Sequence, residues 1–253
     1  MAPPQVLKIN LGCGYHGAPG WINIDASFRI WFSRYRRPNR STSIAPPPCG
    51  SPPSVRNRVE EPPPNYRRIN LRTGRLPFAS GSVDYCYSSH FLEHLPRWEA
   101  ARLVREVSRV LAPGGLLRIV VPDLELIARL YVGAISAAEP ERGAFAALIP
   151  EYDTPSHKLN AYFSKHPRRE EIPARALRTR LSRWADLRFG AALPHQWMYD
   201  LQDLTNLLKE AGFRGITKQA YRRGEMPDLD VLDIERHRDE SLYVEARTPG
   251  LTV

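Results

Sequence analysis

The chain has 253 residues, of which 42% are apolar, and a formal net charge of +9. A chain of this size can bury one sizeable core, so we expect a single domain over 1–253 that carries insertions. No apolar run approaches the ~18 residues of a membrane span, and the first ten residues lack the apolar stretch of a secretory signal, which predicts a cytoplasmic protein. The three cysteines form no CxxC pair, so neither a disulfide framework nor a zinc site is expected, and we predict no metal site.

The positive charge is concentrated in one stretch. Residues 29–72 hold ten arginines against two glutamates, which accounts for +8 of the +9. Within this stretch, residues 33–65 are rich in proline and arginine, a composition that buries too little apolar surface to offset the entropy of ordering. We predict a flexible insertion there. Because arginines outnumber lysines thirty-one to five in the whole chain, we favour compositional bias over selection for phosphate contacts and expect no nucleic-acid partner.

Short apolar segments separated by turn residues predict a wound α/β fold. Strands are expected at 6–11, 21–25, 65–71, 83–89, 116–121, 216–222 and 241–247. Amphipathic or capped helices are expected at 97–111, from Asp123 onward and at 200–212, and residues 123–195 are expected to form a helical lid. Strands that alternate with helices predict a mostly parallel sheet, and the helix-free C-terminal end predicts an antiparallel pair at one edge.

The first crossover is too short for a helix. Gly12 and Trp21 lie nine positions apart with Gly17, Pro19 and Gly20 between them, whereas a parallel crossover normally takes a dozen or more residues. Pyrophosphate binding relies on the N-terminus of the helix that follows the glycine loop, so a dinucleotide is disfavoured. A ligand with an adenosine, an amino-acid end and no phosphate needs only close approach to the glycines, and S-adenosylmethionine has that shape.

Informative side chains follow the strands at their carboxyl ends, where ligands of wound sheets bind. Asp25 can accept hydrogen bonds from ribose hydroxyls, while the Asn70 side-chain carbonyl and the Leu71 amide can face adenine. Cys13 stands where a small side chain is needed beside the cofactor. The predicted cofactor-binding residues are Gly12, Cys13, Gly14, Asp25, Asn70, Leu71 and Ser89.

Two histidines are candidates for catalysis. If S-adenosylmethionine donates its methyl group, the transfer is an in-line displacement, and a hydroxyl acceptor must also lose a proton, for which histidine is the natural base at neutral pH. His195 precedes the helix at 200–212 and should lie on the ligand side, or else pack in a loop. His90 follows the fourth strand and either lines the methyl-transfer mouth or begins a helix. His94 is expected to pair with Glu93 or with a neighbouring backbone group.

Several segments together resemble the class I S-adenosylmethionine-dependent methyltransferases, and among them the bacterial type 11 group with a shortened first crossover. They are "LGCG", "GWINID", "LPFASGSVDYCYSSHFLEHL", "REVSRVLAPGGLLRIVVPDLE" and "HQWMYDLQDLTNLLKEAGF". The resemblance implies a Rossmann-like α/β fold, with a mostly parallel seven-stranded sheet, an antiparallel edge and helices on both faces. It also implies cofactor contacts at Gly12, Gly14, Asp25, Asn70 and Leu71. The chain has Asn70 where the family usually has aspartate, so a charged acceptor is replaced by a neutral one.

The reaction expected is O-methylation of a small-molecule or sugar-containing metabolite in biosynthesis, because the lid favours a discrete substrate pocket. Methylation of a nucleic acid or protein docked by the basic insertion is one alternative. A methyltransferase fold that uses the cofactor for a non-methylating reaction, or a module without enzymatic activity, is another. The sequence does not indicate an oligomeric state.

Overall fold

The structure is a computed structural model that describes residues 6–27, 63–136, 154–164 and 195–250. Most of the predicted insertion at 33–65 and much of the predicted lid at 123–195 lie outside the described residues. No helix in the described ranges is long and apolar enough to span a membrane.

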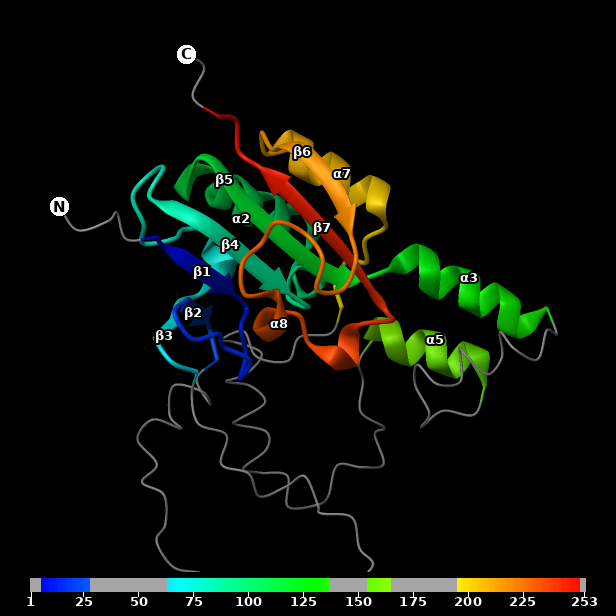
Figure 1. The fold of residues 1–253 in the computed structure, drawn as a ribbon. Coiled ribbons are helices and arrows are strands. Elements are labelled where there is room, and N and C mark those ends of the chain that lie inside the picture. Colours follow the sequence, from blue (N-terminus) through cyan, green and yellow to red (C-terminus); the bar gives the residue numbers. More distant parts are fainter. Residues whose placement is uncertain (1–5, 28–62, 137–153, 165–194, 251–253) are drawn as a thin grey trace, which may run out of the picture.

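The described residues form one seven-stranded sheet of order β3-β2-β1-β4-β5-β7-β6 (Figure 1). Strands β1 to β5 are parallel, and β7 is antiparallel to both of its neighbours, which confirms the predicted mostly parallel sheet with an antiparallel edge. The strands are β1 (Lys8–Leu11), β2 (Ile22–Asp25), β3 (Tyr66–Arg68), β4 (Val83–Ser89), β5 (Leu111–Pro122), β6 (Arg214–Gln219) and β7 (Ser241–Arg247). The helices are α2 (Arg97–Val110), α3 (Leu124–Ile135), α5 (Pro155–Ser164), α7 (Leu201–Glu210) and α8 (Leu229–Leu232), with 3-10 turns η2 (Leu71–Thr73), η3 (Leu92–His94) and η5 (Glu235–His237).

Two helices begin at the caps that the sequence predicts. The Asp123 carboxylate accepts a hydrogen bond from the Leu126 amide at the start of α3, and the Asp200 carboxylate accepts one from the Asp203 amide at the start of α7. Such caps satisfy backbone N–H groups that have no partner within the helix. Both caps fix where the chain turns at the carboxyl edge of the sheet.

β3 and β5 differ most from the prediction in length. β3 ends at Arg68, so Asn70 lies beyond the strand and caps η2 instead. β5 begins at Leu111 and includes the "APGG" stretch that predicts a break. Leu111 pairs with Val83 and Leu116 pairs with Tyr85, so the extra residues are accommodated as an irregularity in register. A bulge of this kind absorbs proline and glycine without ending the strand.

The two faces of the sheet are covered differently. One face packs against α2 and α7 in a large apolar core that includes Ile9, Leu117 and Val244. The other face buries a smaller cluster, in which Trp21, Tyr87 and Tyr243 pack against residues of α8. Figure 1 shows α8 and the loop before it lying over the front of the sheet. The second face is therefore covered largely by the segment between β6 and β7, residues 220–237.

The short first crossover is held by side-chain amides in place of a helix. Asn23, which is fully buried on β2, accepts hydrogen bonds from the Asn10 side chain at 3.0 Å and the Ala18 amide at 3.1 Å. Its own amide donates to the carbonyls of Ala18 and Pro64 at 3.0 and 2.7 Å. The glycine loop thus turns tightly from β1 into β2, as the spacing of Gly12 and Trp21 predicts.

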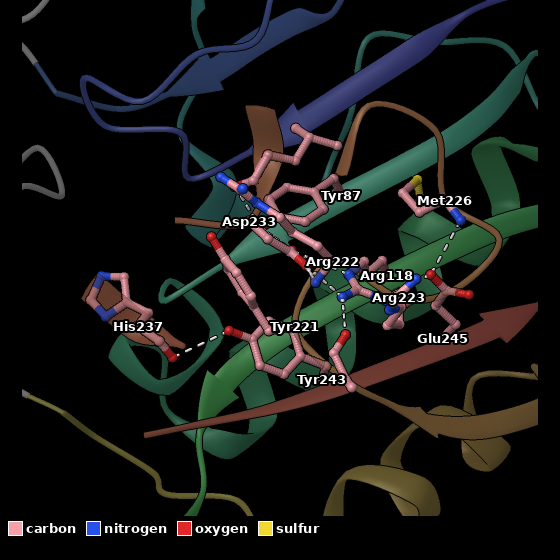
Figure 2. Close-up of polar contacts among 12 residues, drawn as sticks. Tyr87, Arg118, Tyr221, Arg222, Arg223, Met226, Asp233, His237, Tyr243 and Glu245 are labelled. Carbon is pink, nitrogen blue, oxygen red and sulfur yellow. Dashed lines mark hydrogen bonds and ion pairs between the residues drawn. The ribbon is translucent and has the colours of Figure 1, made fainter. Parts of the chain in front are cut away.

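The 220–237 segment is anchored by a buried arginine on β5. The Arg118 side chain has no exposed surface and donates to Asp233 at 2.6 and 3.3 Å and to Glu245 at 2.9 Å. It also donates to the backbone carbonyls of Arg223 and Ala220 at 2.9 and 3.1 Å, so each guanidinium N–H has an acceptor. Figure 2 shows this side chain between the two carboxylates.

The carboxylates of Asp233 and Glu245 accept further hydrogen bonds from backbone amides and a tyrosine. Asp233 also accepts from the Tyr87 hydroxyl at 3.0 Å and from the Arg222 amide at 2.8 Å. Glu245 accepts from the amides of Glu225 and Met226 at 2.8 and 3.2 Å. Two buried carboxylates need this many donors because burial of a charge is costly unless it is paired and hydrogen-bonded.

Replacing Arg118 with methionine should lower the free energy of unfolding by about 3–5 kcal/mol, because two buried carboxylates lose their shared cation. Urea unfolding followed by circular dichroism measures the change. The matched control is Arg129→Met, since Arg129 is exposed and pairs with Glu125 on the surface of α3; its cost should stay below about 1 kcal/mol. Equal effects of the two substitutions would show that the buried network does not hold the segment.

Candidate functional site

A cavity opens at the carboxyl edge of the sheet, where β1 and β4 lie side by side. It has a volume of about 160 Å³ and brings together three stretches of chain. The glycine loop contributes Asn10, Gly12, Cys13, Gly14 and His16; the end of β4 contributes Tyr87, Ser89 and His90; and the 220–237 segment contributes Leu232, Ile234, Arg236 and His237. Whole small-molecule sites typically occupy ~300–1,000 Å³, so this cavity would hold one end of a cofactor of that class.

The two glycines of the loop meet different demands. Gly12 has φ of +68°, and a Cβ at that position would lie 2.2 Å from Cγ of Phe91. Gly14 has φ of +52°, and nothing within 4 Å would touch a Cβ there. The backbone at Gly12 is therefore fixed by contact with protein, whereas the backbone at Gly14 borders open space that a ligand can approach.

Asp25 lies where the sequence predicts it, at the end of β2 beside the glycine loop. Its Oδ2 accepts from the Gly14 amide at 3.0 Å and its Oδ1 accepts from the Ser27 amide at 2.7 Å. Burial raises the pKa of this carboxyl, and hydrogen bonds from the backbone of Ser27, Gly14 and Ala26 oppose the shift. Each carboxylate oxygen can accept a further bond. Asp25 does not line the cavity itself but contacts it through Gly14.

The prediction that Asn70 ends β3 is wrong by two residues. Its Oδ1 accepts from the Arg72 amide at 3.1 Å, so the oxygen expected to face adenine is a helix cap. Leu71 is buried in the main core, where only its backbone could serve a ligand. Neither residue lines the cavity, and their contact with a cofactor stays a prediction.

Cys13 and Ser89 both line the cavity. The Cys13 thiol is buried, and burial together with the nearby Asp25 carboxylate raises its pKa. A thiol so disposed stays protonated at neutral pH and is a poor nucleophile. Contact of Cys13 and Ser89 with a cofactor stays a prediction.

His90 lines the cavity in a strained backbone conformation, with φ of +47°. Its ring stacks on His237 with centroids 3.7 Å apart. Its Nε2 lies 2.8 Å from the Ser241 hydroxyl, and its Nδ1 lies 3.5 Å from Glu93. The ring is thus held by protein groups on both nitrogens and on one face.

His237 and Glu240 form a histidine–carboxylate pair at this cavity. His237 Nδ1 lies 2.7 Å from Glu240 Oε1, and His237 Nε2 accepts from Arg236 at 2.8 Å. Because a guanidinium cannot accept a hydrogen bond, Nε2 carries the lone pair and Nδ1 carries the proton that Glu240 accepts. Tyr243 fixes the backbone by donating to the His237 carbonyl at 3.2 Å (Figure 2).

No motif in the sequence indicates this pair. The stretch between the last two strands has no predicted role, although two antiparallel neighbours must be joined at one edge of the sheet. Because β6 runs parallel to β1 and β4, its connection to β7 emerges at the same edge as the glycine loop. That topological argument could have directed attention to His237.

His195, the other predicted catalytic residue, does not line this cavity. Its side chain is 4% exposed and packs beside Glu93, with His94 on the same carboxylate. The backbone carbonyl of Glu93 accepts from the amides of Gln196 and Trp197, which fixes the start of this segment. A catalytic role for His195 stays a prediction.

Comparison with known proteins agrees with this geometry. Residues 50–119 match a family model described as a methyltransferase domain. A crystal structure of a SAM-dependent methyltransferase from Methanosarcina mazei is similar over 98% of this chain and 95% of that one, with a TM-score of 0.50 and 15% identity, which shows a shared fold. Residues 50–119 are therefore similar to a methyltransferase domain, and the chain shares the fold of the Methanosarcina mazei structure.

Other relatives match over a shorter stretch or more loosely. The chain is 56% identical over 50 residues to an uncharacterized methyltransferase of Mycobacterium sp. (strain KMS), and this match covers 20% of the chain. The matched stretch spans about a fifth of the length of that curated relative, 19%. An S-adenosylmethionine-dependent methyltransferase from Mesorhizobium loti is similar over 97% of the chain and 93% of its own, at 20% identity and a TM-score of 0.43.

Substituting the loop glycines separates their roles. Gly12→Ala should lower the free energy of unfolding by about 2–5 kcal/mol, because the new methyl group meets Phe91 in a left-handed backbone. Gly14→Ala carries only the backbone strain, about 1–2 kcal/mol. Chemical denaturation of the two variants measures the difference. Equal decreases in the free energy of unfolding would mean that the loop shifts to relieve the contact with Phe91.

Proposed function

We propose that the protein binds S-adenosylmethionine at the glycine loop and methylates an oxygen of a small-molecule or sugar-containing acceptor. The observation that carries the proposal is the shared cavity, which His237 lines together with Gly12 and Gly14 while its Nδ1 contacts Glu240. A cofactor site and a proton acceptor at one cavity are what an O-methyltransferase requires.

The residues at the edge of the sheet fit the cofactor. Asp25 would hold the ribose through the free lone pairs of its carboxylate, and the open space beside Gly14 admits close approach to the backbone. The cavity between Gly12, Ser89 and His90 would take the amino-acid end. When bound, S-adenosylmethionine supplies a methyl group activated by the positive sulfur.

His237 is suited to remove the acceptor's proton. Its Nε2 carries the lone pair, and Glu240 would stabilise the charge that develops on the ring when Nε2 takes up a proton. In the structure Arg236 donates a hydrogen bond to this lone pair, so the hydroxyl of the substrate would have to displace the exposed arginine side chain. His90 is a positioning residue, because its stacked ring fixes the plane of His237.

Asp25→Asn should weaken S-adenosylmethionine binding by about 1–3 kcal/mol, roughly 5- to 150-fold in Kd, since an amide presents one acceptor oxygen in place of two. Isothermal titration calorimetry measures the affinity. Asp84→Asn is the matched control, because Asp84 accepts the Leu7 amide at the opposite edge of the sheet. Unchanged affinity in Asp25→Asn, with the protein folded, would refute the ribose assignment.

Glu240→Gln should reduce kcat about 100-fold and leave the Kd for S-adenosylmethionine unchanged, because the proton transfer loses its charge partner. Methyl transfer from labelled cofactor to acceptors extracted from the host gives the rate. The control is Glu235→Gln, a nearby exposed carboxylate that accepts from Tyr221 and should leave kcat unchanged. If both variants turn over like the unaltered protein, His237 is not the base.

A further inference from the structure

A second group of histidines surrounds a buried carboxylate behind the cavity. Glu93 lies on η3 with no exposed side-chain surface, next to His94, and His195 approaches from the segment that leads into α7. The exposed fractions of the two imidazoles are 17% and 4%. One donor atom from each of the three residues lies within 4.8 Å of the others.

The spacing within this cluster is longer than a hydrogen bond. Glu93 Oε1 lies 3.8 Å from His94 Nε2 and 4.0 Å from His195 Nε2, whereas N–H···O bonds span about 2.7–3.2 Å. Ligand atoms of a tetrahedral cation with bonds of 2.0–2.2 Å lie about 3.4 Å apart. The two distances to Glu93 exceed this spacing by about 0.4 and 0.6 Å, and the donor atoms of the two imidazoles lie within 4.8 Å of each other, so side-chain shifts would bring all three atoms onto one cation.

We propose that Glu93, His94 and His195 bind a zinc ion. Two imidazoles and one carboxylate are a ligand set that zinc accepts, with a water in the fourth position.

The environment of Tyr199 supports a polar ligand at this cluster. It is completely buried, and its hydroxyl has no hydrogen-bond partner among the residues that the structure describes. Burial raises the pKa of Tyr199; the Arg97 guanidinium opposes this shift, and the carboxylates of Asp203 and Glu93 add to it. A water bound to the zinc ion would give this hydroxyl a partner.

The ion would have a structural role, joining the segments that carry His94 and His195, and would take no part in methyl transfer. His94 and His195 are about a hundred residues apart in the chain, and two backbone hydrogen bonds already tie their segments together through the Glu93 carbonyl. Glu93 also faces His90 Nδ1 at 3.5 Å, so the ion would fix the residue on which His237 stacks.

The test uses the full chain, purified without chelators and with any histidine tag removed. Elemental analysis should find about one equivalent of zinc per chain. After chelator treatment, added Co²⁺ should give the visible absorption of a tetrahedral site, and added Zn²⁺ should raise the thermal midpoint. His195→Ala and His94→Ala should lose at least tenfold in metal affinity, while His237→Asn, in the neighbouring cluster with His90 and Glu240, should retain it.

Each outcome decides the proposal. Trace metal only, no cobalt absorption and an unchanged thermal midpoint in the unaltered chain would overturn it, and the cluster would be an imidazole–carboxylate network. Metal retained in both alanine variants but lost in His237→Asn would overturn it as well, because the ion would lie at the other cluster. If an alanine variant fails to fold, the cobalt titration of the unaltered chain still decides.

Discussion

The buried ion pairs of Arg118 are the constraint on which the arrangement of the site depends. One guanidinium on β5 joins Asp233, Glu245 and two backbone carbonyls. These contacts fix both ends of the 220–237 segment against the sheet, since Ala220 and Asp233 lie near its two ends. A network of this kind contributes less to net stability than to a defined geometry, because desolvation offsets much of its attraction. Here the defined geometry is the approach of Arg236 and His237 to the glycine loop.

The short first crossover explains why such an anchor is needed. With no helix between β1 and β2, this face of the sheet would leave Trp21 and Tyr87 uncovered, and burial of these rings is a large part of the smaller core. The 220–237 segment covers them and continues into the cavity. The same segment therefore covers this face of the sheet and places His237, which pairs with Glu240, at the cavity. The absence of a crossover helix is thus what leaves room for the segment that carries the proposed base.

Much of the fold could be predicted because local signals and global topology agree. Asp123 and Asp200 cap helices as expected, and the spacing of Gly12 and Trp21 excludes a crossover helix. Asn70 was misplaced because strand propensity continues past Arg68, and only the hydrogen bond to Arg72 reveals the turn. His237 and the His94–His195 cluster depend on segments distant in sequence, so no local pattern indicates them. Pairing of distant residues is a tertiary property that one sequence does not display.

The proposed function requires that the 220–237 segment and the glycine loop form one cofactor site. Amide hydrogen exchange with and without S-adenosylhomocysteine, the demethylated product of the cofactor, measures whether they do. We expect slower exchange on binding in peptides that cover residues 11–14 and in peptides that cover 232–237. Protection of the glycine loop alone, with exchange at 232–237 unchanged, would contradict it.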